Sequence, residues 1–64
     1  MRINRKKLVL AMLEKDINQK QLAEISGVSR VTIGAIKSGK SCADQTAYKI
    51  AKALEMPLEK LVEG

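Results

Sequence analysis

The sequence predicts an all-α fold, and two observations support this prediction. Apolar residues recur at spacings of three and four along most of the 64 residues, whereas no sustained alternation of apolar and polar residues indicates a strand. Residues that favour helix N-termini stand ahead of the apolar segments, at Asn4, Asn18 and Ser29. Because the chain has neither an internal repeat nor a linker-like segment, we expect one domain over residues 1–64.

The first two predicted helices each follow an asparagine cap. The first runs from Asn4 to Lys15, and its buried stripe is expected to hold Leu8 and Met12, with Val9 and Leu13 as further candidates. The second follows Asn18, where Gln21 stands three residues later as in a capping box. It is expected to end at Gly27, because a glycine readily adopts the left-handed conformation that closes many helices.

Three further helices are predicted in the second half of the chain. One begins after the Ser29 cap and ends at Gly39. The next spans Asp44 to Glu55 and places one apolar face inward, consisting of Ala47, Ile50, Ala51 and Leu54. Pro57 ends that helix and suits the first turn of a short fifth helix, Leu58 to Val62. The sequence therefore predicts five helices.

Composition excludes several classes of function. The chain has no histidine, one cysteine (Cys42) and one aromatic residue (Tyr48). Catalytic Ser-His-Asp or Cys-His sets and histidine-based zinc sites are thus excluded, as is an aromatic platform that stacks single-stranded bases. No run of about 18 apolar residues indicates a membrane span. We expect a cytoplasmic protein that is not an enzyme.

The charge distribution favours a polyanionic partner. The net charge is +5, and residues 1–40 hold nine basic and three acidic residues, whereas residues 41–64 hold three basic and four acidic ones. A basic half beside a nearly neutral half indicates one face directed at a polyanion such as nucleic acid.

The segment Gln19–Ser38 carries the functional signal. Its two short helices meet across Gly27–Ser29, a turn too short for an antiparallel pair, so they are expected to cross steeply. Ala23 supplies the small residue that such a close crossing needs, and Ile33 and Ile36 share the inner face of the second helix. The opposite face, which starts at Arg30, is then free to enter a major groove about 12 Å wide.

The pattern Gln19-x-x-Leu22-Ala23-x-x-x-Gly27-Val28-Ser29-Arg30-x-Thr32-Ile33 resembles the helix-turn-helix of Cro/CI-type (XRE) regulators. The later segments Thr46–Leu54 and Pro57–Leu61 are similar to the family's fourth and fifth helices. The resemblance implies a five-helix, lambda-repressor-like domain whose second and third helices form the helix-turn-helix. It also implies a transcriptional regulator, here expected to be a repressor, that binds double-stranded operator DNA and needs no cofactor.

The resemblance also assigns roles to residues, position by position. The positions that usually read bases are occupied by Arg30 and Val31, with Gly34 as a further base contact. The positions that touch phosphates hold Gln19, Ser29, Thr32, Lys37, Lys40 and Ser41. Arginine suits guanine because it bonds O6 and N7 together, and valine suits the methyl group of thymine.

Three positions depart from the family pattern. Many members pair an arginine in the first helix with an acidic residue at the end of the third, but those positions hold Met12 and Lys37, so Lys37 is available for DNA. Gly34 lies inside the recognition helix, where glycine costs about 1 kcal/mol relative to alanine. Glu55 replaces the glycine that often ends the fourth helix.

The resemblance implies a dimer, and we expect a weak one that forms mainly on DNA. The expected contact is an apolar patch around and beyond Pro57, made of Met56, Leu58, Leu61 and Val62. The alternative is that Leu58 and Leu61 close the core, in which case the contact lies near Tyr48 or in the loop after the third helix.

Two other functions stay open. One is an antitoxin or excision regulator, which uses the same fold. The other is an adaptor that binds proteins and not DNA; such an adaptor needs no excess of basic residues, so retention on a heparin column would favour DNA binding over it.

Overall fold

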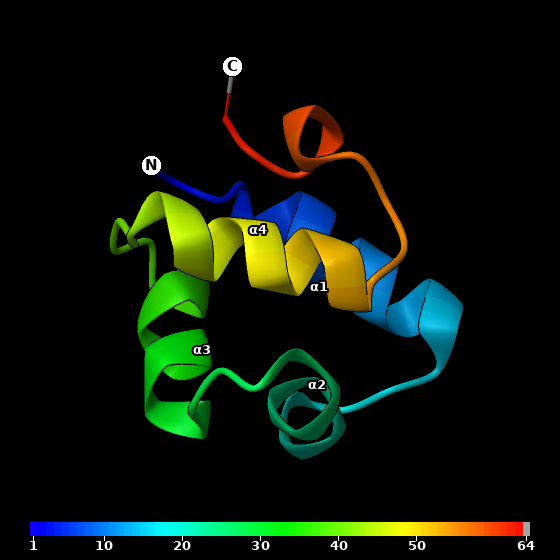
Figure 1. Ribbon diagram of the computed structural model, residues 1–64. Coiled ribbons are helices and arrows are strands. Elements are labelled where there is room, and N and C mark those ends of the chain that lie inside the picture. The colour runs from blue at the N-terminus through cyan, green and yellow to red at the C-terminus, as the bar shows by residue number, and fades with distance from the viewer. Residues whose placement is uncertain (64) are drawn as a thin grey trace.

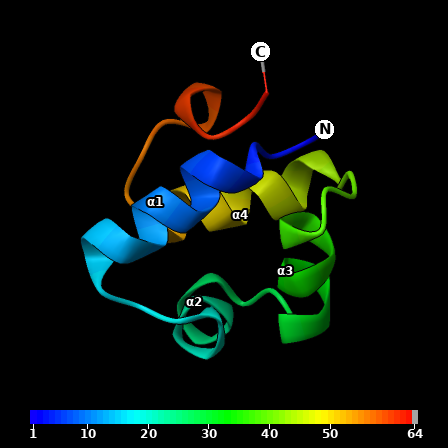
Figure 2. The same cartoon turned by 180° about the vertical axis from the view of Figure 1, so that it is seen from behind.

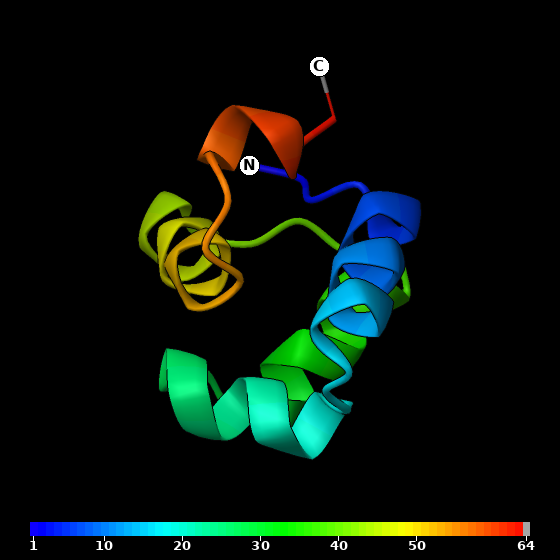
Figure 3. The same ribbon diagram turned by 90° about the vertical axis from the view of Figure 1, so that its right-hand side faces the viewer.

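The computed structural model describes residues 1–63, which form four α-helices and one short 3-10 helix. Their bounds are α1 Arg5–Lys15, α2 Gln19–Ser26, α3 Arg30–Lys37, α4 Asp44–Ala53 and η1 Leu58–Lys60. Figure 1 shows α4 in front of α1, with α2 and α3 below them and η1 above. In the side view of Figure 3, α1 and α4 lie opposite each other over the α2–α3 pair. The prediction of an all-helical helix-turn-helix domain is confirmed for this part of the chain.

The three predicted caps are all present. The Asn4 side chain accepts hydrogen bonds from the backbone amides of Lys6 and Lys7, each at 3.0 Å. At the start of α2 the Gln21 amide donates to Asn18 Oδ1 (2.8 Å) while the Asn18 amide donates to Gln21 Oε1 (2.9 Å), which is a complete capping box. These short-range bonds explain why α1 and α2 begin where the sequence predicts.

The core lies between the four helices and is closed by the two ends of the chain. Seven large side chains are fully buried: Ile3, Leu8, Leu22, Ile33, Ile36, Ile50 and Leu61. The predicted inner face of α4 is confirmed, since all four of its residues are buried. With so small a core, each of these side chains contributes a large share of the stability.

The prediction of a fifth helix over Leu58–Val62 is wrong. Only Leu58–Lys60 are helical, as one 3-10 turn after Pro57. The chain then runs beside the N-terminal segment, where the Asn4 amide donates to the Leu61 carbonyl (2.9 Å) and the Glu63 amide to the Arg2 carbonyl (3.0 Å). A β-bridge between Ile3 and Val62 joins the same two segments. These backbone groups are used between segments, so they cannot continue a helix.

The third and fourth helices end earlier than predicted. The last helical residue is Lys37 in α3 and Ala53 in α4, two residues before the expected ends in each case. Gly39 then has φ 97° and Glu55 has φ 56°, both in the left-handed region that interrupts a helix. Gly39 adopts this conformation easily, whereas Glu55 does so as a non-glycine residue.

Glu55 is held in place by an ion pair. Its carboxylate accepts a hydrogen bond of 2.7 Å from Nζ of Lys15, at the end of α1. This hydrogen bond and the lysine charge lower the pKa of the Glu55 carboxyl below its usual value. The pair therefore contributes stability above the ordinary pKa of glutamate, and that contribution is lost as pH falls through the lowered value. Both side chains are exposed enough for salt to weaken it.

The buried stripe of α1 is narrower than the sequence suggested. Leu8 and Met12 are buried as predicted, but Val9 and Leu13 are 40% and 71% exposed, so including those two was wrong. The six residues Leu8–Leu13 are all apolar, and one helix face cannot hold six successive residues. Leu10 is left outside as well, at 56% exposed. The outer side of α1 is thus apolar and uncovered.

Candidate nucleic-acid interface

A short turn sets the angle between α2 and α3. Gly27 ends α2 with φ 74°, and its amide donates to the Ala23 carbonyl at 3.0 Å. Val28 follows and is buried, which anchors the turn to the core. Ser29 then caps α3 by accepting a hydrogen bond from the Thr32 amide (3.1 Å). The turn is therefore fixed at each of its three residues.

The two faces of α3 have opposite character. Ile33 and Ile36 are buried against the core, as predicted. Arg30 and Val31 are exposed at the start of the helix, Val31 to 84%. In Figure 1, α3 stands at one edge of the molecule, so its outer side is uncovered over its whole length. The helix thus presents a rigid outer surface that includes its exposed N-terminal turn.

Gln19 joins the first turns of α2 and α3. Its Nε2 donates to the backbone carbonyl of Arg30 at 3.1 Å, across 11 residues of sequence. A Cβ at Gly34 would lie 3.3 Å from this nitrogen, so glycine leaves the space in which the amide sits. From the sequence, Gln19 and Gly34 were expected to have separate roles, and nothing in the pattern indicated that they lie together. The second Nε2 hydrogen remains available to a ligand.

The hydroxyls of Ser29 and Thr32 bond to each other. Ser29 Oγ donates to Thr32 Oγ1 at 2.8 Å while accepting from the Thr32 amide. The Ser29 hydroxyl proton is therefore engaged within the protein. The first backbone amides of a helix have no partner inside it, and those at the start of α3 lie beside the exposed Arg30 side chain. These amides and the helix dipole suit an anion.

The remaining predicted residues lie at the far end of α3. Lys37 is half-buried in the last turn, and Lys40 and Ser41 are exposed in the following loop. The loop is tied down, since the Lys40 amide donates to the Ala35 carbonyl (3.1 Å). The described residues form three ion pairs, and none of them includes Arg30, Lys37 or Lys40. Within the described residues, these three cations are therefore not neutralised by an ion pair.

Cys42 fastens the loop to the N-terminal segment. Its amide donates to the Met1 carbonyl (2.8 Å) and its carbonyl accepts from the Met1 nitrogen (3.0 Å). Burial is the main cause that raises the pKa of the Cys42 thiol above its usual value. A protonated, half-buried thiol is a poor nucleophile and a poor metal ligand. Within residues 1–63, no cluster of three or more His, Cys, Asp or Glu side chains is arranged to hold a metal ion.

The chain matches a known protein family. A helix-turn-helix family matches residues 8–61, which is most of the chain. The chain belongs to this family, that of Cro/CI-type (XRE) regulators, as its sequence pattern indicated. Among curated proteins, no relative matches. The family consists of DNA-binding regulators of transcription and is typically without enzymatic activity. In the described part of the chain, no helix has both the length and the apolar character needed to cross a membrane.

The contact between Gly34 and Gln19 leads to a prediction with two opposed effects. Gly34→Ala is expected to raise the unfolding free energy by up to about 1 kcal/mol, because alanine favours a helix interior. The new Cβ would also push Gln19 Nε2 from its place by a few tenths of an ångström. DNA affinity should therefore fall while stability, measured by thermal unfolding, rises.

A double-mutant comparison separates this route from a direct contact of Gly34 with DNA. In a Gln19→Ala background there is no amide to displace, so Gly34→Ala should cost less DNA affinity than in the wild type, and the loss that remains there measures the direct approach of a base to Gly34. An equal loss of affinity in both backgrounds would instead mean that the Gly34 backbone itself approaches a base.

Proposed function

We propose that this chain is a transcriptional repressor that inserts the N-terminal half of α3 into the major groove of an operator. The observation that carries the proposal is the arrangement of α3, whose inner face is locked by Ile33 and Ile36 while Arg30 and Val31 project from its exposed first turn. Such a helix fits a groove about 12 Å wide without rearrangement. The action is binding, without catalysis or a cofactor, in the cytoplasm.

Base reading is assigned to the outer side of α3. Arg30 is exposed, forms no ion pair within residues 1–63 and is long enough to bond a guanine with two nitrogens. Val31 offers an apolar tip for a thymine methyl. Gly34, one helical turn after Arg30, has no side chain and so allows a base edge to come close to the backbone.

Phosphate binding is assigned to groups on both sides of α3. On one side are the free Nε2 hydrogen of Gln19 and the start of α3 at Ser29 and Thr32; on the other are Lys37, Lys40 and Ser41. Because the Ser29 hydroxyl donates its proton to Thr32 Oγ1, we assign the contribution of Ser29 to the helix-start amides that its cap leaves free. The Thr32 hydroxyl only accepts in that bond, so we assign its own proton to a phosphate oxygen. Contacts on two sides fix the position of the helix along the groove.

The partner of the protein is proposed to be a palindromic operator bound by two copies. Leu61 cannot belong to the dimer surface predicted from sequence, since it is fully buried in the core. Leu58 is half-buried and borders a hollow with the exposed side chains of Met1 and Tyr48, and Met1 is bonded to Cys42 in the loop after α3. We propose this hollow as the dimer contact. Asp44 and Lys49 on its border would face each other across a two-fold axis.

Selection of bound sites from random double-stranded DNA tests the proposal directly. We expect inverted repeats whose half-site centres are about 34–36 Å apart, which is one turn of DNA. Recovery of sequences without any shared pattern would refute sequence-specific binding.

Salt dependence tests the phosphate contacts. Lys40→Ala should weaken binding to operator and random DNA alike, and it should reduce the log-log slope of affinity against salt by about 0.9, the value for one phosphate. Lys52→Ala is the matched control, because Lys52 is exposed on α4 and is not among the predicted contacts. An unchanged slope for Lys40→Ala would remove Lys40 from the interface.

A further inference from the structure

The outer side of α1 carries a seam of exposed residues spaced as in paired helices. It consists of Lys6, Lys7, Leu10, Leu13 and Glu14, all of them exposed. Leu10 stands three or four positions from each of the other members, which places all of them near one face of the helix, as in the contact of two packed helices. At its centre, Leu10 and Leu13 are 56% and 71% exposed. Exposed leucines grouped in this way indicate a surface for another protein.

The two ends of this seam are complementary to each other about Leu10. If a second copy of α1 lies antiparallel with Leu10 opposite Leu10, then Lys6 faces Glu14 of the other copy, and Glu14 faces its Lys6. The same register places the apolar stem of Lys7 over Leu13. A surface that is complementary to itself under a two-fold rotation is what a symmetric contact between identical chains requires.

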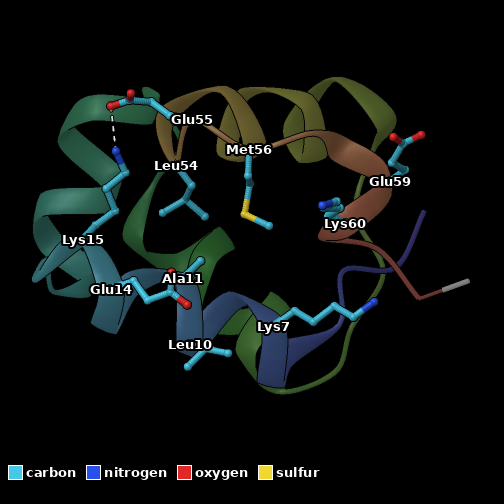
Figure 4. Close-up of a pocket in the computed structure, with 10 residues that line it drawn as sticks. All are labelled: Lys7, Leu10, Ala11, Glu14, Lys15, Leu54, Glu55, Met56, Glu59 and Lys60. Atoms are coloured by element: carbon cyan, nitrogen blue, oxygen red, sulfur yellow. Dashed lines mark hydrogen bonds and ion pairs between the residues drawn. The ribbon is translucent and has the colours of Figure 1, made fainter.

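The charged ends of the seam have no competing partners. None of the three ion pairs among residues 1–63 includes Lys6, Lys7 or Glu14. In Figure 4, Leu10 points away from Leu54 and Met56, which form the opposite wall of the groove beside α1. Leu10 borders that groove, but its side chain does not fill it and is directed at solvent.

The seam lies on a different side of the molecule from the hollow near Tyr48. Figure 2 shows α1 in front, whereas α4, which carries Tyr48, is in front in the opposite view of Figure 1. A chain that used the hollow would still have its α1 seam free. The seam is thus a separate surface and does not extend the proposed dimer contact.

We propose that the α1 seam binds the α1 seam of a second copy, antiparallel and centred on Leu10, in chains free of DNA. One helix of 11 residues makes a small interface, so the association is weak and is seen at high protein concentration. Its specificity comes from the two symmetric Lys6–Glu14 pairs on either side of the leucines. This surface goes beyond the proposed function, since it needs neither DNA nor the residues assigned to DNA.

Sedimentation equilibrium without DNA tests the apolar centre. Leu10→Glu places two carboxylates opposite each other on the two-fold axis and should weaken self-association about tenfold or more. Leu10 is largely exposed, so the helical signal in circular dichroism should stay intact. Self-association that is unchanged by Leu10→Glu, or a wild-type chain still monomeric at about 1 mM, would overturn the proposal.

Exchange of the charges tests the register. Lys6→Glu alone and Glu14→Lys alone should each weaken self-association several-fold, because like charges then meet at both ends. The chain carrying both changes should recover the wild-type affinity, since each end again joins opposite charges. A mixture of the two single variants should associate as well, as a heterodimer with both pairs matched.

General electrostatics predicts a different pattern. Lys6→Glu reduces the positive net charge and so reduces long-range repulsion between copies, yet the proposed contact predicts weaker association. Lys52→Glu, an equal change at an exposed site on α4, should not weaken association. Each change on α1 places a charge that suits the helix dipole at its end, so loss of the helix does not explain a loss of association. Failure of the double variant to recover would refute the register.

Discussion

Replacing Ile33 by alanine is expected to lower the unfolding free energy by about 2–5 kcal/mol. Ile33 is fully buried at the contact of α3 with the rest of the core, and its loss leaves a cavity that such close packing fills only in part. A chain of 64 residues has a total stability of roughly 3–10 kcal/mol, so the variant loses a large part of it or unfolds. Urea unfolding followed by circular dichroism gives the midpoint and slope that measure this effect.

Val31→Ala is the matched control on the same helix. Val31 is 84% exposed two residues away, so its truncation should change the unfolding free energy by no more than about 0.5 kcal/mol. Comparable losses in the two variants would mean that α3 is not packed through its Ile33 face. If the Ile33 variant keeps its helical signal at low temperature, its DNA affinity tests whether a loosened α3 still reads the groove.

The starts of the helices could be predicted because their signals are local. Asn4, Asn18 and Ser29 each bond to amides two or three residues ahead, so a few neighbouring residues determine the start. The end of α2 was equally local, since Gly27 is a glycine placed where a positive φ is needed.

The last segment could not be predicted in the same way. Residues after Lys60 leave the helix because the backbone of Leu61 and Glu63 pairs with that of Asn4 and Arg2, 57 and 61 positions earlier in the sequence. No pattern within the segment reports such a partner. The same pairing places Leu61 in the core, which removed it from the expected dimer patch.

In the candidate interface too, the features set by neighbouring residues could be predicted, and those set by distant residues could not. Helical spacing alone separated Ile33 and Ile36, which are buried, from Arg30 and Val31, which are exposed. The bond from Gln19 to the Arg30 carbonyl and its dependence on Gly34 lie across the turn between two helices. Their geometry requires the crossing angle of α2 and α3, which the sequence indicates only as steep.

Arg30→Ala is expected to weaken operator binding by about 1–3 kcal/mol and to have a much smaller effect on random DNA. The exposed side chain leaves the first turn of α3, where the proposed function places a base edge. Competition titrations against operator and random duplexes at one fixed salt concentration give the two losses side by side. Equal losses on both would mean that Arg30 binds phosphate.

Arg30→Lys shows which property of the side chain matters. Lysine keeps the positive charge but lacks the planar group that bonds guanine through two nitrogens at once. If Arg30 reads a guanine, the lysine variant should retain binding to random DNA and lose much of the preference for the operator. If charge alone is needed, lysine should restore both affinities, and specificity would then have to come from Val31 and Gly34. Because Gln19 bonds the carbonyl of Arg30 and not its side chain, neither substitution removes the link between α2 and α3, so these outcomes report on the side chain itself.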